Sequence, residues 1–310
     1  MSFRERFLWI GEVSLTIVKD SLNLEYDSIS PSAKSLLLTK AFTTIPFARE
    51  AAGLIWGENF LRDSRERLSS LGFILRVIHF EKRYWSIDEA LRKVGMMNIL
   101  EFSSGFSFRG LSMCKDPEIC YIDTDLPQII KTKEPIVQEL SRKYCDYPID
   151  NLVLKPLDVF DENAFIESTN QFSNDPIAIV NEGLLVYFDE GQKRKLCEII
   201  HNLLNAKGGY WITSDIYIKN EIQDTITNGF YEKKGEKFLE EHHVEENKFD
   251  NFKVAEDFFK GCGFEIYMKI DLPTARLSSR KLLVNIPRIK LKEIKTRKKI
   301  RETWILKPKE

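Results

Sequence analysis

The hydrophobic pattern of the chain changes at about residue 97, and this change constrains the fold more than any other feature of the sequence. From there on, short apolar runs alternate with amphipathic segments, which is typical of repeated strand and helix units and hence of a mainly parallel sheet. The pattern predicts an α/β fold with seven candidate strands. They are Asn98–Phe102, Cys120–Asp123, Leu152–Leu154, Ile177–Val180, Tyr210–Thr213, Phe264–Ile270 and Lys281–Ile286.

Residues 1–92 lack strand alternation and are predicted to form helices. Ser30 followed by Pro31 resembles a helix N-cap with proline at the first helical position. A capping box over Ser86–Glu89 predicts a second helix start, and that helix should end near Gly95.

Three helices are predicted between the strands. Pro127 should begin one that reaches about Tyr144, and Asp189 with Gln192 forms a capping box before another. The third covers about residues 254–260. The segment 216–251 is longer than a plain connection needs, which favours a lid-like insertion.

The formal net charge of −1 averages two unlike regions. Residues 288–310 contain ten Lys or Arg and three Glu, a net charge of +7, which leaves −8 for the first 287 residues. A single aromatic residue in this basic stretch, Trp304, makes nucleic-acid binding a poor interpretation. We therefore interpret 96–287 as the sheet domain and 288–310 as a basic tail outside it.

Composition also bears on compartment and metal content. No apolar run is long enough to span a membrane, and Glu12 interrupts the first apolar stretch, so a cytoplasmic protein without a membrane partner is expected. Five cysteines without a C-x-x-C pair argue against a disulfide framework and against a structural zinc site. We expect no metal.

Polar residues follow the first four predicted strands, at the edge of the sheet where parallel α/β proteins bind ligands. Glu101 stands at the end of the first strand before a loop with one glycine, Gly105. This loop lacks the several glycines that a pyrophosphate requires, whereas a sulfonium ligand has no phosphate to cradle. The acids Asp123 and Asp125 come 18 and 20 residues after Gly105, where a carboxylate can accept hydrogen bonds from a ribose diol. The third and fourth strands are followed by Leu157 with Asp158 and by Asn181 with Glu182.

Several motifs together resemble the leucine carboxyl methyltransferase family, and especially its bacterial branch of polyketide O-methyltransferases of the tetracenomycin type. The resemblance covers about residues 29–272, and its most specific motifs are Asp123–Pro127 and Asn181–Tyr187. Residues 29–33, Phe80–Trp85 and the Gly105–Arg109 loop complete it. The resemblance implies a Rossmann-like, seven-stranded class I methyltransferase sheet with S-adenosyl-L-methionine as cofactor. It also implies that residues 1–95 form an N-terminal helical cap over the site.

The resemblance assigns roles to individual residues. Arg83 matches the arginine that binds the methionine carboxylate, and Gly105 matches the cofactor-loop glycine. Asp125 matches the ribose-binding acid, Asp158 the adenine-side acid, and Glu182 the acid near the donor's amino group. The cofactor-binding candidates are Arg83, Glu101, Gly105, Asp123, Asp125, Leu157, Asp158, Asn181 and Glu182.

The acceptor is expected to be a polyketide-like small molecule that receives the methyl group on a carboxylate or a hydroxyl. Arg109 and Arg276 are candidates to orient an acidic acceptor, and Tyr187 is the third candidate for substrate binding. A carboxylate needs no general base, whereas a phenol does, and His242, His243 or Tyr187 could serve as that base.

Two other functions compete with methyl transfer. A nicotinamide-dependent oxidoreductase would share the sheet and the ribose acid but would need the missing glycines. A catalytically silent binding protein is the second alternative, because Ser103 stands where the family usually has the first loop glycine and Ser107 where it usually has aspartate.

Overall fold

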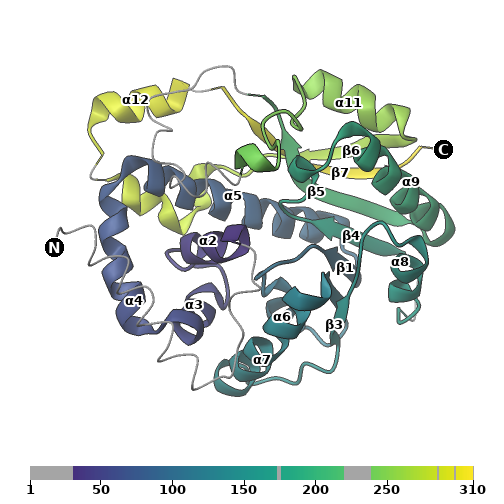
Figure 1. Cartoon of the computed structure of the whole chain (residues 1–310), viewed down its shortest axis with the longest axis horizontal. Helices are drawn as coiled ribbons and strands as arrows, with labels where there is room; N and C mark the ends of the chain where they lie inside the picture. Colours follow the sequence, from purple (N-terminus) through teal and green to yellow (C-terminus); the bar gives the residue numbers. More distant parts are fainter. Residues whose placement is uncertain (1–30, 173–175, 220–238, 285, 297, 310) are drawn as a thin grey trace.

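The computed structural model describes residues 31–172, 176–219, 239–284, 286–296 and 298–309. Within these residues, seven strands form one sheet in the order β3-β2-β1-β4-β5-β7-β6 (Figure 1). Neighbouring strands from β3 to β5 are parallel, and β7 runs antiparallel between β5 and β6. The strands are β1 (Asn98–Phe102), β2 (Cys120–Asp125), β3 (Leu152–Pro156), β4 (Ile177–Asn181), β5 (Gly209–Tyr217), β6 (Phe264–Ile270) and β7 (Arg301–Pro308).

The strand order distinguishes this sheet from the dinucleotide-binding sheet. The dinucleotide-binding sheet is parallel with the order 3-2-1-4-5-6, and it has no antiparallel strand between the last two positions. This protein has an antiparallel seventh strand inserted between the fifth and the sixth. The predicted Rossmann-like sheet of seven strands is therefore confirmed.

Helices cover both faces of the sheet. One face packs against α8, α9 and α11 around the fully buried Trp211 and Trp304. The other face packs against α5, through Ile87 and Leu91, and against α6 and α7. The helices are α2 (Pro31–Lys40), α3 (Ala48–Trp56), α4 (Glu58–Asp63), α5 (Leu71–Val94), α6 (Arg109–Met113), α7 (Pro127–Tyr144), α8 (Glu162–Thr169), α9 (Glu190–Lys207), α11 (Phe252–Gly261) and α12 (Arg288–Thr296).

Local signals placed most helix ends correctly. Pro31 begins α2, Pro127 begins α7, and the capping box of Asp189 with Gln192 begins α9. Ser30 lies outside the described residues. The predicted end at Gly95 is confirmed, because Gly95 caps α5 in a left-handed conformation.

The predicted helix start at Ser86 is wrong. Helix α5 runs without interruption from Leu71 to Val94, and Ser70 is its N-cap. The Ser86 hydroxyl donates to the carbonyl of Arg83 at 2.7 Å and also contacts the Thr303 hydroxyl at 2.6 Å. A serine buried inside a helix thus satisfies its hydroxyl locally, although its sequence context resembles a cap.

The predicted seventh strand and the predicted tail are also wrong. Residues Ser278–Leu283 form a short 3-10 helix, and the seventh strand is Arg301–Pro308. Thr303, Trp304, Ile305 and Leu306 are buried in the sheet between β5 and β6. These four buried residues lie inside the basic stretch and complete the sheet, so the sheet domain extends past residue 287. The exposed charges of this stretch belong mainly to α12 and its flanks.

Helices α2, α3 and α4 gather at one side of the sheet, and α5 runs from them across it (Figure 1). Leu37, Ala51 and Ile55 from α2 and α3 share an apolar cluster with Phe106 and Phe108, which follow β1. Most of the predicted insertion, residues 220–238, lies outside the described residues. No helix in the described part of the chain is long and apolar enough to cross a membrane.

Candidate functional site

A cavity of about 500 Å³ lies at the carboxyl ends of the parallel strands, and helix α2 forms part of its wall. Ala33, Leu36, Leu37 and Lys40 line it from α2, and the loops after β1, β2, β3 and β4 line it from the sheet. This is the position at which open parallel sheets bind ligands. The cavity is thus where the sequence placed the site.

The structure separates the predicted site residues into three groups. Those that line the cavity are Arg83, Gly105, Asp125, Leu157, Asp158, Glu182 and Tyr187. Those that are buried next to it but do not line it are Glu101, Arg109, Asp123 and Asn181. Arg276 lies on the surface, with 63% of its side chain exposed, and its guanidinium is 3.7 Å from Glu89.

The loop after β1 forms one wall of the cavity, and two of its residues have left-handed backbone conformations. Gly105 has φ of 52°, and so does Ser103. The amide of Gly105 donates to Asp125 Oδ2 at 2.7 Å, and the amide of Leu126 donates to Asp125 Oδ1 at 2.7 Å. Burial raises the pKa of Asp125, and these two hydrogen bonds oppose that effect. The carboxylate of Asp125 is therefore fixed at the carboxyl end of β2, facing the loop after β1.

The left-handed Ser103 gives a testable consequence. A side chain with a Cβ atom pays about 1 kcal/mol or more in this conformation, whereas glycine does not. We expect Ser103→Gly to raise the free energy of unfolding by about 1 kcal/mol, measured by chemical denaturation. Ser103→Ala is the matched control, because it removes the hydroxyl and keeps the Cβ atom. Stabilisation by both variants, or by neither, would contradict the strain at this position.

Asp123 faces away from the cavity. Its Oδ2 atom is 2.6 Å from Lys133 Nζ on α7, and Ser104 donates a hydrogen bond to its other oxygen. Lys133 also donates to the Ser104 hydroxyl at 3.0 Å. All three residues are buried, so this group anchors α7 and the loop to β2.

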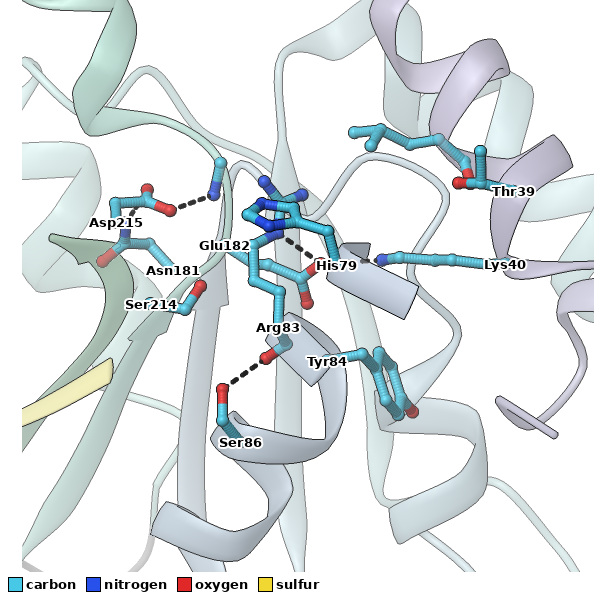
Figure 2. Close-up of polar contacts among 12 residues, drawn as sticks. Thr39, Lys40, His79, Arg83, Tyr84, Ser86, Asn181, Glu182, Ser214 and Asp215 are labelled. Atoms are coloured by element: carbon cyan, nitrogen blue, oxygen red, sulfur yellow. Dashed lines mark hydrogen bonds and ion pairs between the residues drawn. The ribbon is translucent and has the colours of Figure 1, made fainter. Parts of the chain in front are cut away.

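Glu182 is the centre of a buried charge cluster (Figure 2). Its Oε1 atom lies 2.9 Å from Lys40 Nζ and 3.2 Å from Arg83 Nε, and its Oε2 atom lies 2.9 Å from Arg109 Nη2. Burial raises the pKa of Glu182, but the three cations outweigh it and hold the pKa well below its usual range. Burial lowers the pKa of Lys40, and Glu182 opposes that effect. Three elements, α2, α5 and α6, thus meet at one carboxylate.

Arg109 is fully buried and joins three carboxylates. Besides Glu182, its guanidinium contacts Glu101 and lies 2.7 Å from Asp88 Oδ1. It also stacks 4.2 Å from the centre of the Tyr84 ring. Burial lowers the pKa of Arg109, but the surrounding acids more than offset this and raise it. Arg109 therefore links the three carboxylates of the cluster, although it does not line the cavity itself.

Two charged residues in or beside the cavity were missed by sequence reasoning. Lys40 lines the cavity, and its signal was a lysine between two apolar stretches, Leu36–Leu38 and Ala41–Phe42. Asp215 is buried in β5, where its carboxylate accepts hydrogen bonds from the amides of Gly183 and Leu184 at 2.6 Å each and from Asn181 Nδ2 at 2.7 Å. An acid inside an apolar strand was its signal. Asp215 thereby fixes the loop that follows Glu182.

Part of the cavity wall is mainly apolar. Phe160, Leu184, Tyr187 and Phe188 line it together with His242 from the segment before α11. The rings of Tyr187 and His242 meet edge to face with their centres 6.0 Å apart. Mainly apolar walls with two polar ring side chains, Tyr187 and His242, suit a small organic ligand.

The described residues contain no group of three or more His, Cys, Asp and Glu side chains that could hold a metal ion.

No protein-family model and no curated protein matches this sequence. Solved structures do match it, at low identity and with TM-scores of 0.43. They include LepI in complex with SAM (10% identity, 72% of this chain and 46% of that chain), the mitomycin 7-O-methyltransferase MmcR (11%, 97% and 68%) and PigF with SAH (12%, 90% and 70%). This chain spans less than half of the LepI chain.

Proposed function

We propose that this protein is an S-adenosylmethionine-dependent O-methyltransferase that acts on a small organic acceptor. One observation carries the proposal. The cavity at the carboxyl ends of the sheet is bounded by Asp125, Asp158 and Glu182 and by a loop whose amides include only one glycine, Gly105. Acids at these positions suit a nucleoside that carries a cationic amino acid, and such a loop suits a ligand without a pyrophosphate.

The residues present fit the donor group by group. Asp125 has acceptor capacity beyond its two amide hydrogen bonds and would take the ribose diol. Asp158 would accept from the adenine amine. Arg83 would bind the donor's carboxylate, since its Nη2 atom is buried without a hydrogen-bond partner while the side chain lines the cavity. Glu182 has one acceptor position left for the donor's amino group, because three of about four are occupied.

The bound donor would supply a methyl group on a positively charged sulfur. The residues of the protein have to orient the acceptor toward that methyl group and exclude water. An acceptor carboxylate is ionised at neutral pH and needs no base. For a hydroxyl acceptor, His242 is the side chain in the cavity wall that could receive the proton.

The proposal includes the organisation of the chain. Residues 1–95 would act as a cap over the donor, and the segment 216–251 would act as a lid that brings His242 to the acceptor. The motifs of the sequence further support membership of the leucine carboxyl methyltransferase family and its polyketide O-methyltransferase branch. Leu36 and Leu37 of the proposed cap and His242 of the proposed lid line the cavity. Together with Phe160, Leu184 and Phe188 they give it a mainly apolar wall, which supports a polyketide-like acceptor.

Calorimetric titration with S-adenosylhomocysteine tests the proposal. We expect saturable binding by the wild-type protein, and about 100-fold weaker binding by Asp125→Ala because two charge-assisted hydrogen bonds to the ribose are lost. The exposed Asp150→Ala is the matched control and should bind like the wild type. No heat at millimolar ligand, or binding of NADH in its place, would contradict the proposal.

A further inference from the structure

The guanidinium of Arg83 is held at two of its three nitrogens. Its Nε atom donates to Glu182 Oε1 at 3.2 Å, and its Nη1 atom donates to the Tyr217 hydroxyl at 3.4 Å. Its Nη2 atom is buried and has no hydrogen-bond partner. A Cβ atom added to Gly183 would lie 3.0 Å from Nη2, so only glycine leaves this side of the guanidinium uncrowded. The two held nitrogens therefore determine where the third one points.

The Tyr217 hydroxyl can accept from Arg83 only if its own proton points elsewhere. His79, one helical turn before Arg83 on α5, places its Nε2 atom 2.8 Å from that hydroxyl. If Nε2 accepts the tyrosine proton, the imidazole is neutral and carries its hydrogen on Nδ1. Figure 2 shows His79 beside Arg83, with Lys40 reaching Glu182 from another helix.

The surroundings of His79 favour this neutral form. Burial lowers the pKa of His79 well below its usual value, and the nearby charges act in the same direction. A second positive charge beside the Arg83 guanidinium would be unfavourable in a site with little access to water. The charges with the largest effect on the imidazole are those of Arg301, Arg83, Lys248 and Lys82, and Tyr217 is its neighbour on β5.

We infer that His79 and Tyr217 are positioning residues, which orient the Arg83 guanidinium toward the carboxylate of an amino-acid-bearing nucleoside. The inference rests on the proposed function and adds to it a second layer of residues behind the donor site. Neither residue lines the cavity, so neither touches the ligand. Their effect should therefore appear only with ligands that carry the carboxylate.

Two ligands separate positioning from a merely structural role. S-adenosylhomocysteine has the amino-acid carboxylate, and 5′-methylthioadenosine has the same nucleoside without it. We expect Tyr217→Phe to weaken the first ligand about tenfold, the loss of one hydrogen bond to a charged group, and to leave the second unchanged. The half-exposed Tyr267→Phe is the matched control and should change neither affinity.

Two substitutions of His79 test whether a hydrogen-bond acceptor at this position is sufficient. His79→Gln keeps an acceptor that can reach the tyrosine proton and should bind S-adenosylhomocysteine within about twofold of wild type, whereas His79→Leu should resemble Tyr217→Phe. In the wild-type protein, the affinity ratio of the two ligands should stay constant from pH 8 to about 6.5 and fall only below it. This pH series needs no variant, so it tests the inference even if a substitution unfolds the protein.

The outcomes are distinct. If the wild-type protein binds neither of the two ligands, the proposed function itself is refuted. Wild-type binding of both ligands, with equal losses for both in Tyr217→Phe or with no loss for either, overturns the positioning role and leaves the proposed function standing. A selective loss of S-adenosylhomocysteine affinity in Tyr217→Phe and His79→Leu, with affinity close to wild type in His79→Gln, supports the positioning role.

Discussion

Replacing Glu182 with glutamine should lower the free energy of unfolding by about 3–5 kcal/mol, because it leaves three buried cations without their shared counter-charge. Lys40, Arg83 and Arg109 all lie within 3.2 Å of this carboxylate, and 3% of its side chain is exposed. Chemical denaturation followed by circular dichroism measures the change. The same variant should also lose affinity for S-adenosylhomocysteine, since α2 and Arg83 are both anchored to Glu182.

The pH dependence gives an independent check on the same carboxylate. The pKa of Glu182 is lowered in the folded protein, so its stabilisation is complete above the unfolded value of about 4.5 and is lost as the pH falls further. The difference between wild type and Glu182→Gln should therefore shrink below about pH 4.5. The exposed Glu118→Gln is the matched control and should change the free energy by less than about 0.5 kcal/mol. Equal effects of the two substitutions would mean that the cluster does not stabilise the protein.

Much of the fold could be predicted because its signals are local. The first six strands are short apolar runs with turn residues on either side, and Pro127 and the Asp189–Gln192 box mark helix starts by their own backbone chemistry. The seventh strand could not be predicted in the same way. Its longest buried run is four residues and lies in a basic stretch. It forms a strand only because it fills the space between β5 and β6.

The candidate site shows the same division. Acids at strand ends identified Asp125, Asp158 and Glu182 as residues of the cavity. Position at a strand end could not by itself separate Asp125 from Asp123, and only the family resemblance favoured Asp125. The difference in the structure is made by Lys133, which helix α7 brings over β2. Lys40 was missed for a related reason, since its partner Glu182 is 142 positions away in the sequence and only the packing of α2 brings them together.

Arg109→Met should destabilise the protein by at least about 4 kcal/mol, because it leaves the buried Glu101 and Glu182 and the partly exposed Asp88 around an uncharged side chain. Asp88, Glu101 and Glu182 all accept from the guanidinium, which is fully buried. Arg109→Lys should cost less but still more than 1 kcal/mol, since one ammonium group cannot reach three acids in the geometry of a planar fork. Denaturation of the ligand-free protein measures both changes.

The absence of ligand is what gives this measurement its value. A residue that binds only the acceptor contributes nothing to the stability of the free protein, whereas a counter-ion for two buried acids and one partly exposed acid contributes to it at all times. Arg142→Met, at an exposed ion pair with Glu139 on α7, is the matched control and should stay within about 0.5 kcal/mol of wild type. If Arg109→Met were as stable as this control, the buried cluster would not be a structural unit. That result would again favour the sequence-based prediction that Arg109 binds an acidic acceptor.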